Sequence, residues 1–291
     1  MRKIRRKREK RKKKIIIVSV FLFLIIMTSS YAAFQTNITL KVKGNIIPNC
    51  KIGEITINTV TEGDGLYKDE YENEKCIYKG RYPDNYIMFN EELWRIISKE
   101  SDGTYMIIKN AGLEAMAFDE GVGARWADPS SLNTYLNGDY YDSLTSTAKD
   151  QMTSHVFYAG DIVDSNDDLA TQIEDEKKTE WYGNVGLVSI SDYIKTFSDD
   201  ELCGNFKLLA LNGNSCRVFS WMVNRYWAIN GATTTTTSPW SIQQYVIGRQ
   251  NNAEPWADNV SREYSPRPVV FLKSTIKLTG SGTENDPFII G

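Results

Sequence analysis

The chain has 291 residues, 34 lysines and arginines against 37 aspartates and glutamates, and a formal net charge of −3 at pH 7. Eleven of the basic residues lie between Arg2 and Lys14, next to a single acid, Glu9. The remainder has 23 basic and 36 acidic residues, a balance that argues against nucleic-acid binding by the main body.

An apolar stretch, Ile15 to Met27, follows the basic run directly. Its length, about thirteen residues, is typical of a signal peptide and short for a membrane span of about 20. The basic flank predicts a cytoplasmic N-terminus. Small residues near Ala32 offer a cleavage site, whereas continuation through Phe34 gives an uncleaved anchor. Residues 1–33 are therefore predicted to be a signal peptide or a membrane anchor, and the rest is expected to be extracellular, secreted or held at the cell surface.

Apolar and polar residues alternate from Phe34 to Ile46, which predicts a half-buried strand that Pro48 ends. A polar loop follows as far as Cys76. We therefore expect residues 34–76 to form a strand-bearing neck and residues 77–291 to form the extracellular domain.

The four cysteines are Cys50, Cys76, Cys203 and Cys216. An exported chain enters an oxidising compartment, where cysteines pair. Three pairings are open, and we favour neighbours in sequence, Cys50–Cys76 and Cys203–Cys216, because each would close one irregular loop. Free buried thiols are the alternative. No CxxC spacing occurs, so a zinc site is not expected.

The main body has the pattern of an antiparallel sheet. Strands are predicted at Tyr86–Phe89, Leu93–Ser98 and Thr104–Lys109, with a turn at Asp102-Gly103. A helix is predicted after Asp128 as its N-cap, with an interruption at Gly138. The predicted fold class is α+β: an antiparallel sheet with one or two helices and long loops, preceded by the N-terminal hydrophobic helix.

Several stretches resemble a known group of proteins. They are DGLYKDEYENEKCIYKG (64–80), NYIMFNEELWRIISKESDGTYMIIKN (85–110), WADPSSLNTYLNGDYYDSLT (126–145), GNVGLVSISDYI (183–194), the segment 203–216 with SWM, and RPVVFLKSTIKLTGSGTENDPFII (267–290). In this order they resemble uncharacterised extracellular domains of Gram-positive bacteria and their relatives. Those domains are similar to the C-type-lectin-like fold, a broad group that includes ligand-binding domains and formylglycine-generating enzymes.

The resemblance implies how the fold closes. Val269–Leu272 and Phe288–Ile290 would be core strands that meet the early strands, with Gly280-Ser281-Gly282 turning between them. One departure is the Thr233–Thr237 run, which looks like an insertion and puts in doubt any ligand carried over from the relatives.

Catalytic and metal-binding signals are weak. His155 is the single histidine, and without a supporting motif we expect it on the surface or at a strand edge. Asp164, Asn166, Asp168 and Asp175 follow the spacing of a calcium loop, but Leu169 replaces the required glycine. A solvated acidic loop is the simpler interpretation, so no metal and no cofactor are expected.

Aromatic residues are the remaining signal. Trp240, Tyr245 and Trp256 lie in the segment that forms ligand-facing loops in the C-type-lectin-like fold, and exposed rings of this kind anchor sugars or proteins. Trp221 and Trp227 match the family-like positions and are expected in the core.

The sequence thus predicts a non-enzymatic recognition or adhesion domain whose ligand is a surface glycan or protein. Its membrane contact would be the N-terminal segment. A polysaccharide-active or protein-modifying enzyme is the alternative, which requires acids or a Cys/His pair converging in a cleft.

Overall fold

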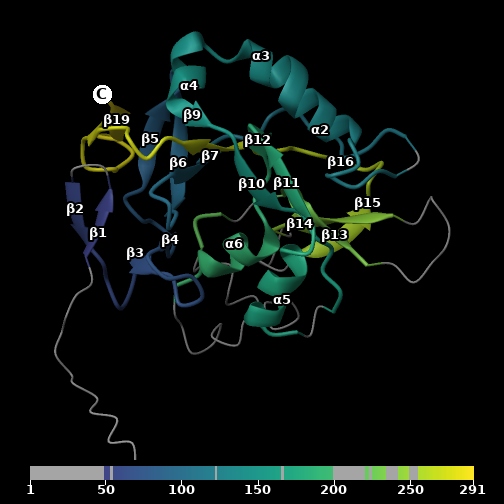
Figure 1. The fold of residues 1–291 in the computed structure, drawn as a ribbon, viewed down its shortest axis with the longest axis horizontal. Coiled ribbons are helices and arrows are strands. Elements are labelled where there is room, and N and C mark those ends of the chain that lie inside the picture. Colours follow the sequence, from purple (N-terminus) through teal and green to yellow (C-terminus); the bar gives the residue numbers. More distant parts are fainter. Residues whose placement is uncertain are drawn as a thin grey trace, which may run out of the picture. The chain divides into compact units, whose positions relative to one another are not determined.

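The computed structural model describes residues 49–52, 55–121, 123–164, 167–198, 220–222, 225–233, 242–248 and 255–291. All of them belong to one unit of the chain, Ile47–Gly291. They are mostly β structure with short helices (Figure 1), so the α+β class is confirmed. Within these ranges no helix is long and apolar enough to cross a membrane. The apolar stretch 15–27 and the strand predicted at 34–46 lie outside the described residues.

A large sheet is the centre of the described fold. Its order is β12-β17-β7-β6-β5-β19-β18, with β4 also pairing with β6, β3 with β4, and β9 with β17. The strands are β3 (Gly65–Lys68), β4 (Cys76–Lys79), β5 (Tyr86–Phe89), β6 (Glu92–Lys99), β7 (Tyr105–Lys109), β9 (Met152–Thr153), β12 (Val185–Gly186), β17 (Val269–Leu272), β18 (Leu278–Thr279) and β19 (Phe288–Ile290).

The meander β5-β6-β7 agrees with the sequence prediction to within a residue at nearly every boundary. Strands covered on both faces contain continuous apolar runs, and Ile96, Ile97, Ile107 and Ile108 are all fully buried. Gly103 has a φ of +89° in the turn between β6 and β7. The N–H of the next residue, Thr104, donates a 2.9 Å hydrogen bond to the Asp102 carboxylate, which fixes that turn.

The C-terminal strands close the sheet as expected. β17 runs antiparallel to β7, and β19 runs parallel to β5 with Phe288 opposite Ile87. Gly282 has a φ of +79°, and a Cβ there would lie 2.4 Å from the Asp84 carbonyl oxygen, so glycine is required. The predicted core strands and the turn between them are confirmed.

One group of helices follows β8 (Met116–Ala117) in the chain and lies along one side of the large sheet (Figure 1). It contains α2 (Ser131–Tyr135), the π-helical turn η1 (Leu136–Tyr140), α3 (Tyr141–Ser143) and α4 (Ser146–Gln151). The N-cap of α2 is Ser130, whose hydroxyl accepts from the Asn133 N–H, so the expected cap at Asp128 is wrong. The expected interruption at Gly138 agrees with the structure, because the π-helical turn η1 contains Gly138 and separates α2 from α3.

A second group, α5 (Leu169–Glu176) and α6 (Ile190–Lys195), lies on the opposite side (Figure 1). The carboxylate of Asp168 caps α5, and the hydroxyl of Ser189 caps α6. Neither helix was predicted, and the expectation of one or two helices is therefore too low. Both helices are short and bury their apolar residues, Leu169 and Ile173 in α5 and Ile190 and Ile194 in α6, so packing rather than periodicity identifies them.

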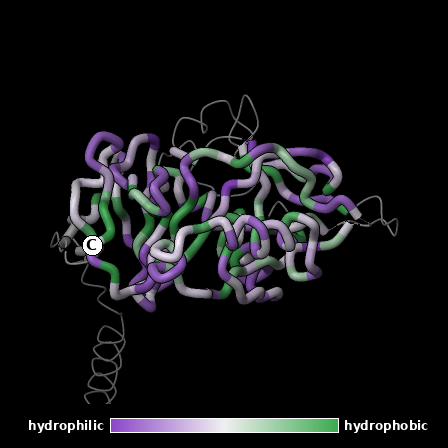
Figure 2. Tube along the Cα trace, turned by 90° about the horizontal axis from the view of Figure 1, so that it is seen from above, coloured by the Kyte–Doolittle hydropathy of each residue, from purple (hydrophilic) through white to green (hydrophobic). Residues whose placement is uncertain are grey.

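Four smaller sheets complete the described part. Their strands are β1 (Asn49–Ile52) with β2 (Ile55–Asn58), β10 (His155–Tyr158) with β11 (Glu180–Gly183), β13 (Tyr226–Ala232) with β14 (Gln243–Ile247) and β15 (Trp256–Asn259), and β8 (Met116–Ala117) with β16 (Glu263–Tyr264). Figure 2 shows hydrophobic stretches running through the interior and hydrophilic residues along the outer turns.

The expected boundary between neck and domain differs from the structure. β3 and β4 are part of the large sheet, so the sheet begins before residue 77. Cys50 in β1 and Cys76 in β4 are joined by a disulfide, which agrees with the first predicted pairing. Both cysteines are buried. Cys203 and Cys216 lie outside the described residues.

Replacing both Cys50 and Cys76 by serine is expected to lower the free energy of unfolding by about 3 kcal/mol, because the bridge closes a loop of 26 residues. Peptide mapping without reduction should recover the linked pair from the wild-type chain, and urea denaturation gives the difference in stability. Recovery of both residues as alkylated thiols would contradict the pairing.

Candidate functional site

The described part of the fold contains a cleft of about 370 Å³. It lies between the turn after β3, the turn between β6 and β7, strand β10 and helices α5 and α6. Its polar lining includes Glu72, Lys75, Glu100, Asp102, His155, Glu176, Ser189, Ser191 and Asp192. Its apolar lining includes Met106, Phe157, Ile229 and Phe271. We call this the acidic cleft, because carboxylates are its most frequent charged groups.

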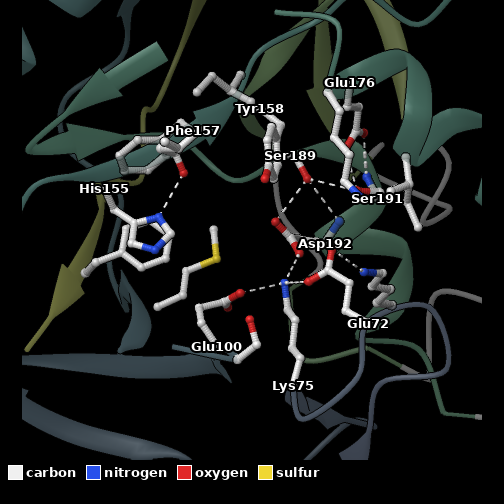
Figure 3. A pocket seen from close by; sticks show the side chains of 18 of the residues that line it. Glu72, Lys75, Glu100, His155, Phe157, Tyr158, Glu176, Ser189, Ser191 and Asp192 are labelled. Carbon is white, nitrogen blue, oxygen red and sulfur yellow. Dashed lines mark hydrogen bonds and ion pairs between the residues drawn. The ribbon is translucent and has the colours of Figure 1, made fainter. Parts of the chain in front are cut away.

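The ammonium of Lys75 is the central charge of the acidic cleft. It lies 3.0 Å from Glu100, 3.3 Å from Asp192 and 3.4 Å from Glu72, and the Lys75 side chain is only 5% exposed. Figure 3 shows Lys75 pointing toward Glu100 and Asp192 at the floor of the cleft. Three carboxylates from three separate parts of the chain are thus held by one buried cation.

The environment shifts the pKa values of this group strongly. Burial by itself would lower the pKa of Lys75, but the carboxylates of Asp192, Glu100 and Glu72 outweigh it and raise that pKa well above its usual value. Burial would conversely raise the pKa of Asp192, yet Lys75 and Lys195 lower it. Lys75 and Asp192 therefore both stay charged and form an ion pair.

A second buried lysine fixes the loop that carries Glu72. Lys195 lies 2.9 Å from the carboxylate of Asp69, and their side chains are 4% and 1% exposed. The other oxygen of Asp69 accepts hydrogen bonds from the N–H groups of Tyr71 and Glu72. The position of Glu72 at the cleft thus depends on α6.

Glu176, the last residue of α5, is buried in the wall of the cleft. Its carboxyl contacts the Ser191 hydroxyl and accepts a 2.8 Å hydrogen bond from the Ser191 N–H. Burial, reinforced by the neighbouring charge of Asp192, raises the pKa of Glu176 to about 8. At neutral pH this carboxyl is mostly protonated and can donate a hydrogen bond.

His155 forms one side of the mouth of the cleft. Its ring stacks on Phe271 with 3.9 Å between the ring centroids, and its Nε2 lies 3.3 Å from Asp102. Its Nδ1 lies 2.9 Å from the Val156 carbonyl oxygen. The expected position at a strand edge agrees with its place in β10, but the proximity to several acids could not be foreseen from the sequence.

The aromatic residues proposed as ligand anchors are not brought to this cleft. Tyr245 is only 8% exposed, so the prediction of an exposed ring is wrong. It lies in β14, the central strand of its sheet, and its ring belongs to the buried hydrophobic core. Trp256 is half-buried and packs edge-on against Tyr264 at 5.8 Å. Trp240 lies outside the described residues. Trp221 and Trp227 are buried as predicted.

The acidic segment around α5 does not form the proposed calcium loop. Asp168 caps α5, while Asp175 lies seven residues later in the buried part of the same helix and pairs with Lys178. Seven helical residues span about 10 Å, too far for two ligands of one ion. Asp164 is exposed, and Asn166 lies outside the described residues. Within the described ranges no cluster of histidine, cysteine or acidic residues is arranged to hold a metal ion.

No model of a known protein family matches the sequence, and comparison with curated proteins and with solved structures found no match.

Replacing Lys75 by methionine should destabilise the fold by about 3–5 kcal/mol, because it leaves Glu100 and Asp192 buried without their cation. Lys177→Met is the matched control, since Lys177 lines the same cleft but is one-third exposed and pairs with the exposed Glu174. Its expected effect is within about 0.5 kcal/mol. Equal losses in urea denaturation for the two variants would contradict the central role of Lys75.

Glu176 should make stability depend on pH. Its folded pKa of about 8 lies above the ordinary value of 4.5, so the folded state binds one more proton than the unfolded state between these values. Stability from this group is therefore present below pH 4.5 and is lost as the pH rises toward 8. Relative to Glu176→Gln, the wild-type chain should lose at least about 1.4 kcal/mol between pH 5 and pH 8.5. Parallel stability curves for the two proteins would show that Glu176 has an ordinary pKa.

Proposed function

We propose that the chain is a non-enzymatic ligand-recognition domain, secreted or attached to the cell surface, that binds its ligand in the acidic cleft. The observation that carries this proposal is the convergence of buried charged groups from four separate segments on one cavity of ligand size. Binding sites are typically concave and combine apolar walls with a few fixed polar groups. The acidic cleft has both features.

The rigidity of the polar groups supports recognition. Asp192 accepts hydrogen bonds from Lys75 and Ser189, and Glu176 is held by Ser191. Groups that are already fixed lose little freedom when a ligand binds, so they contribute affinity and selectivity. The ligand class that we propose is a glycan or an exposed segment of a surface protein.

The fold and the cellular location are part of the proposal. The pairing of β19 with β5 brings the last strand beside the first strand of the meander. Terminal strands that meet in this way are what the resemblance to the C-type-lectin-like fold implies. The buried Cys50–Cys76 disulfide supports an oxidising, extracytoplasmic compartment. The N-terminal basic and apolar segments would then export the domain.

One observation favours an enzyme as the second candidate. The pKa of Glu176 is raised to about 8 and that of Asp192 is lowered, in the same cleft. A protonated acid beside an ionised carboxylate is the division of roles that glycoside hydrolysis uses. Release of reducing ends from polysaccharides by the wild-type chain, abolished in Glu176→Gln, would favour the enzyme over the recognition domain.

The test of recognition uses the full-length chain in detergent micelles on an array of glycans and surface proteins. Ser101 is exposed and lines the cleft, so Ser101→Trp should block the cleft without unfolding the domain. The control is Thr147→Trp, at an exposed position of α4 away from the cleft. We expect Ser101→Trp to weaken binding of the identified ligand at least about tenfold, a change of 1.4 kcal/mol. If both variants bind like wild type, the ligand site is elsewhere.

A further inference from the structure

We propose that the ligand of the acidic cleft carries a primary ammonium group, which is held by carboxylates at the open side of the cleft. This inference rests on the proposed function, because it names the chemical class of the ligand in that site. Two observations support it: the cavity itself, and the way in which the lysines and carboxylates that line it share their charges.

The lysines near the cleft are unequally engaged. Lys177 is paired with Glu174 on the outer surface of α5, whereas Lys195 is paired with the buried Asp69 and also lies 3.9 Å from Glu72. Lys75 is the cation that Glu72, Glu100 and Asp192 share. The two buried lysines, Lys75 and Lys195, thus face the four carboxylates of Asp69, Glu72, Glu100 and Asp192, which leaves an excess of negative charge at the cleft.

Excess negative charge in a partly buried site is unfavourable unless a proton or another cation compensates it. The position of Glu176 agrees with this, since its buried carboxyl lies in the same wall as Asp192 and holds its proton more tightly than an isolated carboxyl. A cationic ligand would provide such compensation at the open side of the cleft.

The carboxylates have surface left for such a ligand. Glu72 is 26% exposed and Glu100 is 12% exposed, while Asp102 at the mouth is 53% exposed. Lys75 contacts the first two from the floor of the cleft, and Figure 3 shows His155 and Glu72 on opposite sides of the cleft. An ammonium entering from solvent would meet these exposed carboxylate surfaces.

The geometry favours an organic cation over a metal ion. The described residues contain no group of three or more acidic, histidine or cysteine side chains placed to coordinate one ion. An ammonium has three donors that can reach separated acceptors. The apolar wall formed by Met106, Phe157 and Phe271 would contact the carbon frame of the ligand, and an aromatic ring near a cation adds attraction.

The test measures binding of defined probes to the full-length chain in detergent micelles by isothermal titration calorimetry. One pair of probes is the β-1,4-linked disaccharide of glucosamine and its di-N-acetylated form, which differ in charge at the amine. Spermidine is the amine without a sugar. We expect the free-amine disaccharide to bind at least about tenfold more tightly than the acetylated form, with affinity that falls as salt is added.

Three variants, each of which replaces a carboxylate by an amide, test whether binding of the free-amine disaccharide depends on the carboxylates of the acidic cleft. Glu100→Gln should weaken binding of the free-amine disaccharide, and Asp102→Asn is a second variant at an exposed turn in case Glu100→Gln perturbs the Lys75 cluster. Glu174→Gln, at a residue that is 73% exposed and outside the cleft, is the matched control and should bind like wild type.

The outcomes separate this inference from the proposed function. If the acetylated disaccharide, or an uncharged ligand from the array, binds the cleft as tightly as the amines, the ammonium inference is wrong and recognition in the cleft stands. If spermidine binds as tightly as the free-amine disaccharide, the inference is supported and the sugar is not needed. If Glu174→Gln weakens binding as much as Glu100→Gln, a diffuse surface charge explains the result and the inference is wrong.

Discussion

The buried ammonium of Lys75 is the interaction on which the cleft depends. Glu72, Glu100 and Asp192 belong to the turn after β3, the end of the β6 hairpin and helix α6, and without a shared cation their charges would repel each other. Charges removed from water are stable only with close partners, so the three segments must approach together. The same contact that holds these segments in place also creates a polar cavity between them.

The sequence predicted the parts of the fold that depend on local pattern. Strands β5, β6 and β7 could be recognised because apolar residues concentrate between clear turn residues such as Asp102 and Gly103. Strands β17 and β19 followed from the resemblance and from the Gly-Ser-Gly turn. The pairing of Cys50 with Cys76 was also foreseen, since nearby cysteines close short loops readily.

The candidate site could not be predicted in the same way. Lys75 and Asp192 are 117 residues apart in the chain, and neither belongs to a motif with a characteristic spacing. Helix α6 spans six residues, too few for an amphipathic pattern to identify it. Tyr245 shows a different error, because an aromatic residue in a polar-rich segment suggested exposure, although its ring packs into the hydrophobic core.

The disulfide has a consequence for the cleft as well as for stability. Cys76 directly follows Lys75 in the chain, so the covalent link to β1 restrains the backbone beside the buried ammonium. Reduction would free that backbone while β6, β7 and β17 remain paired, and local opening of this kind precedes global unfolding in many proteins. A reducing environment would thus act on the acidic cleft through the backbone beside Lys75, before it affects the paired strands of the large sheet.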